Sequence, residues 1–417
     1  MAENTPGILV VGGGISGITV ALEAAEVGYD VTLIEKGPTL GGRVAGFHQY
    51  FPKLCPPVCG LEVNYQRLRR NPRIRVLTRT EVASLSGGPG GYSVRLRTEP
   101  NFVNARCVMC DKCTPACPQE VPSDFDYGMR ATKAIHLPHR MAYPPRYTVE
   151  REHCPIDCAE CVPACPYDAI NLNMVGANEE MAVTSIVYAT GWKPYDPTKL
   201  NLLGFGQHPD VISNVMMERL AAGDGPTQGK LLRPSNGEKV NSVAFVQCAG
   251  SRDEEHLPYC SSICCLASLK QAHYVREANP EAKVYIFYID IRTPGKFEGF
   301  YARTREDENI VFIKGKVAKV GHGEEGKVML EAEDILQGGK VRVDVDLAVL
   351  ATGMEPSLKN DGITGQVIPL DEDGFIAPQL AQPGIFAAGV AKMPNDVNSS
   401  IQDATGMALK AIQTLKG

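Results

Sequence analysis

A glycine-rich turn directly after a short apolar strand is the feature that most constrains this chain. Residues 8–11 are Ile-Leu-Val-Val, and the next six, from Gly12 to Gly17, read Gly-Gly-Gly-Ile-Ser-Gly. Apolar residues then recur at helical spacing, and a second apolar strand covers residues 31–35. Gly12 permits the tight turn, Gly14 lets a ligand approach the backbone, and Gly17 lets the helix pack closely on the strand. The sequence therefore predicts a strand–helix–strand unit whose helix N-terminus binds the phosphates of a dinucleotide.

Later segments favour FAD over NAD as that dinucleotide. Glu35 ends the second strand, where an acid can hold the ribose, and Arg43 follows a Gly-Gly pair, where it can meet the pyrophosphate. Ala-Thr-Gly turns follow apolar strands at 189–191 and 351–353, and Gly389-Val390 precedes a C-terminal helix where related proteins often carry Gly-Asp. This set resembles flavoproteins of the thioredoxin reductase type, which implies an α/β fold with two dinucleotide-binding domains. The candidate cofactor-binding residues are Gly12, Gly14, Ile15, Ser16, Gly17, Glu35, Lys36, Gly41, Gly42, Arg43, Ala189, Thr190, Gly191, Gly353, Gly389 and Val390.

Fourteen cysteines in 417 residues are the main anomaly of the composition. In a large chain without a visible secretion signal, metal or redox chemistry explains them better than disulfides. Eight lie in residues 102–175, in two frames that end in Cys-Pro, and this stretch is predicted to be an inserted ferredoxin domain. In such frames the last cysteine binds the other cluster. One 4Fe–4S cluster is then expected on Cys107, Cys110, Cys113 and Cys165, and the other on Cys117, Cys154, Cys158 and Cys161. A structural zinc site is the alternative, because it also uses pairs of cysteines two residues apart.

A second α/β unit begins at residues 243–247, but it lacks the glycine-rich turn that a nicotinamide cofactor would need. Between Gly250 and Gly295 there is no glycine at all. Four cysteines stand there instead, two of them near the start of a helix whose positive end suits thiolates. These residues, Cys248, Cys260, Cys264 and Cys265, are predicted to hold a third cluster. The alternative is that they are inert cysteines of a hydrophobic core.

The sequence around these four cysteines resembles the family of heterodisulfide reductase A subunits. The resemblance lies in Cys-Ala-Gly-Ser-Arg-Asp at 248–253, in Tyr-Cys-Ser-Ser-Ile-Cys-Cys at 259–265 and in Tyr-Ile-Asp-Ile-Arg at 288–292. It implies an oxidoreductase component that exchanges electrons between FAD and iron–sulfur clusters, the third cluster being of a non-standard type. It also implies sister subunits, so the chain is not expected to act alone.

Within that family, the compact form with residues 51–59 looks most like the flavin subunit of quinone-interacting (quinone-modifying) membrane-bound oxidoreductases of sulfate reducers. This implies two partners: a membrane haem or quinone subunit, and a heterodisulfide reductase-like subunit with flavin and iron–sulfur centres. It further implies electron transfer between the menaquinone pool and adenylylsulfate reductase. The alternatives are a soluble heterodisulfide reductase-type component, with or without electron bifurcation, and a stand-alone NAD(P)H-dependent flavin oxidoreductase.

Two cysteines, Cys55 and Cys59, are left over in the segment Cys-Pro-Pro-Val-Cys. They can be a thiol/disulfide pair beside the flavin, ligands of a metal centre, or two structural residues of a proline-stiffened loop. The histidines show no metal-binding spacing, and no side chain is assigned as a catalytic acid or base.

The charge and hydropathy of the chain limit the kinds of partner that it can have. A net charge of −6 and a pI of about 5.8 argue against nucleic acid, and no apolar run is long enough to span a bilayer. We therefore expect a cytoplasmic chain that reaches the membrane only through a partner. The predicted domain limits are 1–101 and 176–235 for the FAD domain and its linker, 102–175 for the ferredoxin, 236–354 for the cluster-bearing second unit, and 355–417 for the return to the FAD domain.

Overall fold

The computed structural model describes residues 7–358, 368–378 and 381–416, and the chain divides into two compact units. The first unit combines Met1–Ala45, Val58–Trp192 and Pro356–Gly417. The second combines Gly46–Pro57 and Lys193–Glu355. Two short strands, β11 (Trp192–Pro194) and β20 (Met354–Pro356), pair where the chain passes from one unit to the other.

A seven-stranded sheet forms the centre of the first unit, in the order β3-β2-β1-β10-β5-β4, with β21 also paired to β10. Its strands are β1 (Gly7–Val11), β2 (Val31–Glu35), β3 (Ile74–Thr78), β4 (Thr80–Gly88), β5 (Gly91–Thr98), β10 (Ala177–Tyr188) and β21 (Ile385–Ala387). The first half of β10 runs antiparallel to β5, and its second half runs parallel to β1 and β21. The predicted strands at 8–11 and 31–35 are confirmed.

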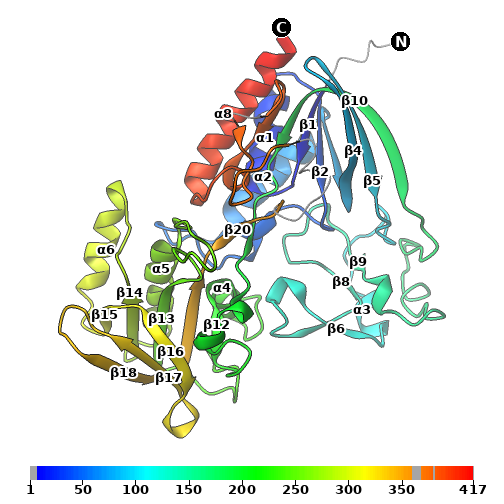
Figure 1. Ribbon diagram of the computed structural model, residues 1–417. Helices are drawn as coiled ribbons and strands as arrows, with labels where there is room; N and C mark the ends of the chain where they lie inside the picture. The colour runs from blue at the N-terminus through cyan, green and yellow to red at the C-terminus, as the bar shows by residue number, and fades with distance from the viewer. Residues whose placement is uncertain (1–6, 359–367, 379–380, 417) are drawn as a thin grey trace, which may run out of the picture. The chain divides into compact units, whose positions relative to one another are not determined.

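The sheet of the first unit is covered by helices that bury an apolar face. These are α1 (Ile15–Glu26), α2 (Val58–Arg70) and α8 (Val397–Lys416). Helix α8, red in Figure 1, packs along α1, so the C-terminal segment lies beside the glycine-rich turn that precedes α1. The buried alanines of α8, among them Ala404 and Ala408, allow this close approach because their side chains are small.

Between β5 and β10 the chain forms a small substructure with its own core. It contains α3 (Cys113–Ala116) and two short hairpins, β6 (Glu120–Pro122) with β7 (Ala131–Lys133) and β8 (Ile135–His136) with β9 (Thr148–Val149). Its core joins aliphatic side chains such as Ile135 and Val149 to the cysteines Cys113, Cys117 and Cys161. With so little regular structure and so few apolar residues, this substructure depends on its cysteines for cohesion.

The second unit is built on a fully parallel sheet in the order β12-β19-β13-β14-β15. Its elements are β12 (Val211–Ser213), α4 (Asn214–Ala221), β13 (Ser242–Ala249), α5 (Cys264–Ala278), β14 (Lys283–Tyr288), α6 (Glu298–Arg305), β15 (Ile310–Lys314), β16 (Val317–His322), β17 (Val328–Glu333), β18 (Lys340–Val345) and β19 (Leu347–Thr352). The second α/β unit predicted to begin at residues 243–247 is confirmed, with β13 as that strand.

Alternate residues of β13 fill two cores, as the two-residue period of a strand requires. Val243 and Phe245 pack with the helix side chains of α4 and α5, while Ala244 and Val246 pack with the antiparallel β16-β17-β18 sheet (Figure 1). Because both faces of the central strand are buried, its sequence is continuously apolar. Near its end the strand carries Cys248, the first of the four cysteines predicted to hold the third cluster.

Candidate functional site

The turn between β1 and α1 has the close packing that a dinucleotide phosphate site requires. Gly12 has φ +109°, which only glycine adopts without strain. A Cβ on Gly17 would overlap the Gly12 carbonyl oxygen and lie 3.3 Å from Val10 Cγ1. The first turn of α1 is therefore drawn tightly onto β1, and the helix N-terminus is left open for an anion.

Two further segments close around this turn. Gly41 N–H donates to Gly13 O at 2.9 Å, and a Cβ on Gly42, whose φ is +55°, would come within 2.9 Å of Gly14 Cα. The Glu35 carboxylate accepts N–H groups from Gly13 and Gly37, both at 2.7 Å. Burial raises the pKa of Glu35, and these backbone donors oppose that rise.

The segments at 189–191 and 389 also reach the glycine-rich turn. A Cβ on Gly12 would overlap the Ala189 oxygen, and one on Gly389 would overlap Ser16 Oγ. Thr190 Oγ1 is buried and lacks a hydrogen-bond partner among the described residues, which fits a site shaped for a bound polar group. Residues far apart in sequence therefore converge here as the flavin hypothesis requires.

Asp403 of α8 fixes the Gly389 segment. It accepts the Gly389 N–H at 2.7 Å and also pairs with Lys392. The neighbouring Val390 is buried. No sequence pattern singles out Asp403, because its role depends on α8 returning to α1.

Three other predicted cofactor residues lie elsewhere. Lys36 is exposed and pairs with Glu81 at 3.4 Å. The Arg43 side chain donates to the Trp192 carbonyl at 3.2 Å and to the Tyr127 hydroxyl at 3.3 Å. Gly353 belongs to the second unit, where a Cβ on it would overlap Ser251 Oγ in the cysteine-bearing loop.

The first cysteine group, predicted as Cys107, Cys110, Cys113 and Cys165, lines one cavity of the small substructure. Tyr147 and Tyr167 also line this cavity. Cys165 Sγ accepts the Ala169 N–H at 3.4 Å, and the left-handed backbone at Met109 and Asp111 curls the cysteine loop around the space. The last cysteine of the second frame is therefore placed with the first three of the first frame.

The second cysteine group consists of Cys117, Cys154, Cys158 and Cys161. These thiols lie close enough to repel one another when ionised. Cys161 lies within electrostatic reach of the other three, and Cys154 within reach of Cys117 and Cys158. Burial, followed by the Cys117 charge, raises the pKa of Cys161 to about 11. The proximity of these thiols agrees with the exchange of the fourth cysteine between the two frames, which stays a prediction.

The third cysteine group, Cys248, Cys260, Cys264 and Cys265, gathers in the second unit where β13 ends and α5 begins. The Cys264 thiol lies within electrostatic reach of the other three thiols. Burial is the main cause that raises the pKa of Cys264, and burial raises that of Cys265 to about 11. Cys248 has φ +55°, a strained conformation for a side chain with a Cβ, which is typical of functional loops.

The thiol spacing bears on which metal would fit. No three cysteine sulfurs of the described residues all lie within 4.8 Å of one another, whereas tetrahedral zinc with Zn–S bonds of about 2.3 Å places them roughly 3.8 Å apart. In a 4Fe–4S cluster each thiolate binds a separate iron, so the sulfurs stand further apart. As thiolates these cysteines would repel one another, and a bound cation removes that cost because it stabilises the thiolates.

The remaining cysteines, Cys55 and Cys59, are both exposed. Cys55 belongs to the second unit and Cys59 to the first, at the start of α2. The sequence-level alternatives for this pair therefore stay open.

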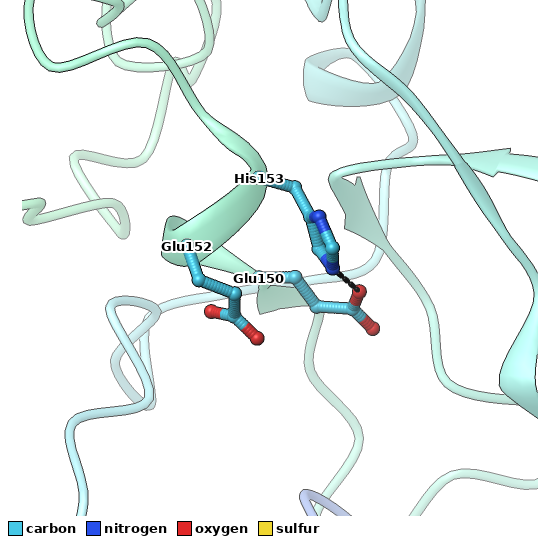
Figure 2. Close-up of side chains that lie close together, drawn as sticks. All are labelled: Glu150, Glu152 and His153. Carbon is cyan, nitrogen blue, oxygen red and sulfur yellow. Dashed lines mark ion pairs between the residues drawn. The ribbon is translucent and has the colours of Figure 1, made fainter.

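One group of potential metal ligands was not expected from the sequence. Glu150, Glu152 and His153 have side-chain ligand atoms within 4.8 Å of one another, and His153 Nε2 lies 3.8 Å from Glu150 Oε2 (Figure 2). Glu152 and His153 are exposed. Because solvated carboxylates commonly gather without a metal, we assign none to this group.

The comparisons with known proteins agree with this arrangement. The family NAD(P)-binding Rossmann-like domain matches residues 10–75. The A subunit of the ferredoxin/F(420)H(2)-dependent CoB-CoM heterodisulfide reductase of Methanosarcina acetivorans is 37% identical over 98% of this chain and 53% of its own length. An iron-sulfur A subunit of the CoB–CoM heterodisulfide reductase of Methanopyrus kandleri is 38% identical over 99% of the chain and 65% of its own length. Along nearly its whole length the chain is similar to heterodisulfide reductase A subunits. It spans about half to two thirds of the length of the curated relatives it matches.

Solved structures establish the fold. Thioredoxin reductase from Lactococcus lactis aligns with a TM-score of 0.54 at 13% identity, covering 99% of both chains. Bacillithiol disulfide reductase from Bacillus cereus aligns with a TM-score of 0.53 at 16% identity, covering 98% of both. The predicted thioredoxin reductase-like α/β fold is confirmed. Among the helices of the described residues, none combines the length and apolar character needed to cross a bilayer.

Proposed function

We propose that the chain is an FAD- and iron–sulfur-containing electron-transfer component of a multi-subunit oxidoreductase. The observation that carries the proposal is the third cysteine group, which lies at the end of β13, the central strand of the parallel sheet of the second unit. In a nicotinamide-binding domain a phosphate-binding glycine turn would stand there. Support also comes from the two cysteine groups of the small substructure and from the segments that converge on the turn at Gly12–Gly17.

In the proposed FAD site, the residues bind and orient rather than react. The N-terminus of α1 holds the pyrophosphate, and Glu35 fixes the glycine turn and the ribose. Asp403 holds the Gly389 backbone against Ser16, and buried Thr190 offers a hydroxyl to the ligand. Bound flavin would supply the exchange between two-electron and one-electron steps.

The cysteine groups would hold three 4Fe–4S clusters and keep them partly shielded from water. Burial of Cys113, Cys161 and Cys264 lowers solvent exposure, one of the factors that sets a cluster potential. The exchange of Cys117 and Cys165 between frames brings the first two clusters close together, as in bacterial ferredoxins. No side-chain acid or base is needed for electron transfer.

We further propose that the chain works beside other subunits, because its relatives are named as subunits of heterodisulfide reductases. The resemblance of residues 51–59 favours a quinone-interacting complex that contains a membrane haem or quinone subunit, with a second flavin–iron–sulfur protein beside it. That complex would be cytoplasmic, attached to the membrane through a partner, and would link menaquinone to adenylylsulfate reductase. The rival role is a soluble heterodisulfide reductase-type complex, as the names of the relatives suggest.

A stand-alone NAD(P)H-dependent enzyme is disfavoured by the geometry of the second unit. Cys248 and Arg252 adopt left-handed backbone conformations in the loop after β13, and Ser251 packs against Gly353. These side chains occupy the position of a phosphate-binding turn. Anaerobic mixing of the purified chain with NADH should therefore leave the flavin oxidised, whereas rapid bleaching would favour the stand-alone enzyme.

The decisive experiment is to purify the full chain anaerobically from its native host and to quantify iron, acid-labile sulfide, zinc, FAD and co-purifying subunits. About twelve iron and twelve sulfide per FAD are expected for three 4Fe–4S clusters. About eight iron would remove the third cluster from the proposal. Zinc without acid-labile sulfide would overturn the electron-transfer function altogether.

A further inference from the structure

Two arginines flank the third cysteine group and are held there by one acid. Arg252 Nη1 donates to Asp290 Oδ1 at 2.6 Å, and Arg292 Nε lies 3.4 Å from the same oxygen. Arg252 comes from the loop after β13, and Arg292 from the loop after β14. Asp290 therefore joins the two loops that border the cysteines.

Each guanidinium lies within electrostatic reach of a different cysteine of the group. The Arg252 side chain interacts with Cys248 and lowers the pKa of that thiol against the larger effect of burial. Arg292 interacts with Cys260, which is the largest cause that raises the pKa of Arg292. In addition, the Arg292 backbone N–H donates to Cys265 Sγ at 3.4 Å. Three of the four sulfurs thus face a donor from this pair of arginines.

The buried amide of Gln247 adds to this donor-rich surrounding. Its Oε1 is placed to accept the Cys265 thiol at 3.3 Å, while its Nε2 is buried and unpaired among the described residues. The two amide atoms differ only by a 180° rotation, so a thiolate at Cys265 would instead draw Nε2 toward sulfur. Cys264 and Cys265 also donate to the backbone carbonyls of Thr352 and Asp290, so the amide rotation is the change that would suit the Cys265 surrounding to an anionic sulfur.

The first cysteine group has a different surrounding. The Asp111 carboxylate, which accepts the Tyr147 hydroxyl at 2.7 Å, adds negative charge beside Cys113 and is among the causes that raise the pKa of that thiol. The arginine pair with its acid, in contrast, brings a net charge of about +1 to the third group, two guanidiniums against one carboxylate. Lys112 also lines the cavity of the first group, and the Arg146 guanidinium lies within electrostatic reach of Cys107, so the first group has both acidic and basic neighbours.

We propose that Arg252 and Arg292 are positioning residues that raise the reduction potential of the cluster held by the third cysteine group; this rests on the proposed function. A 4Fe–4S core with four thiolates is anionic and gains one more negative charge when it accepts an electron from the flavin. Hydrogen bonds to sulfur and nearby positive charge stabilise the reduced state more than the oxidised state. The third cluster therefore retains electrons that would otherwise remain on the flavin.

The test is a reductive titration of the full, cluster-loaded chain with dithionite, followed by electron paramagnetic resonance. The signal of the third cluster is first identified by its loss in Cys264→Ser. Arg252→Gln and Arg292→Gln should each shift the midpoint of that signal to more negative potential and leave the other two signals in place. The shift should be larger for Arg252→Gln, because the Arg252 side chain is 25% exposed and that of Arg292 is 49% exposed.

Lys316→Gln is the matched control. Lys316 pairs with Asp253, the residue after Arg252, at 2.9 Å, but its side chain is 64% exposed and its described ion pair is with the acid alone. It should leave all three midpoints unchanged. If Arg252→Gln loses iron, the midpoint shift in Arg292→Gln is the deciding measurement, because the Arg292 side chain is half-exposed.

An unchanged midpoint in an arginine variant that retains full iron would overturn the inference. The same holds if Lys316→Gln shifts the signal as much as the arginine variants do. If the unaltered chain shows no signal that depends on Cys264, the proposed function itself fails, and this outcome is distinct from the other two.

Discussion

Replacement of Gly17 by alanine tests the dinucleotide turn with a single methyl group. Gly17 lies in the first turn of α1, where a Cβ would overlap the Gly12 carbonyl oxygen and come within 3.1 Å of its carbon. Both atoms belong to the backbone, so neither can rotate away. To accept the methyl group, α1 must move away from the turn that binds the pyrophosphate.

The expected magnitude follows from two opposed effects. In a helix, alanine is more favourable than glycine by about 1 kcal/mol. Overpacking of a rigid contact costs roughly 3 kcal/mol, at the upper end of the usual range because the contact is with backbone. The balance is a loss of about 2 kcal/mol, or roughly a 30-fold weaker affinity for FAD.

The assay is a titration of the flavin-depleted chain with FAD, followed by quenching of flavin fluorescence. Gly406→Ala is the matched control, because Gly406 also lies in a helix, α8, and a Cβ there meets no atom within 4 Å. The control should bind FAD normally and unfold at a slightly higher temperature. Equal FAD affinity in the two variants would refute the reasoning about the turn.

Two further predictions concern buried charges. Lys270 Nζ lies 3.0 Å from Glu218 Oε1, and both side chains are buried. Lys270→Met should lower the free energy of unfolding by about 3 kcal/mol and make amide hydrogen exchange in α5 roughly 100-fold faster. Lys133→Met is the control, because the partner of Lys133 is exposed, and it should change the exchange little. Because burial raises the pKa of Glu35, its ionisation opposes folding as the pH rises through that raised pKa. Glu35→Gln should therefore lose less thermal stability than the unaltered flavin-free chain between pH 4 and 7, and identical pH profiles would contradict this.

Local patterns were sufficient for the first strand–helix–strand unit and for the grouping of the cysteines. The glycine spacing at 12–17 indicates the close approach of α1 to β1, because that approach depends only on residues that are near one another in the sequence. The frames ending at Cys117 and Cys165 predict an exchange of their fourth cysteines, and Cys165 lines the same cavity as Cys107, Cys110 and Cys113. The order of apolar runs likewise predicted most strands of both sheets.

Long-range contacts could not be predicted from these patterns. The segment Gly46–Pro57 belongs to the second unit, where Lys270 donates to the Gln49 carbonyl at 2.8 Å and Phe51 packs on Phe300. Gly353 repeats the Ala-Thr-Gly pattern of residues 189–191 but lies beside the cysteine-bearing loop. Contacts of this kind depend on the tertiary fold, which neither the spacing of residues nor the amino-acid composition reveals.

The iron content of Cys264→Ser, compared with that of the unaltered chain, shows whether the second unit carries a cluster. If the third cysteine group holds a 4Fe–4S cluster, this variant should lose about four iron and four sulfide per chain while it keeps FAD and both other clusters. The control Gly406→Ala, in α8 where a Cβ meets no atom within 4 Å, should keep all of its iron. Equal iron in Cys264→Ser and the unaltered chain would contradict the assignment of a cluster to this group.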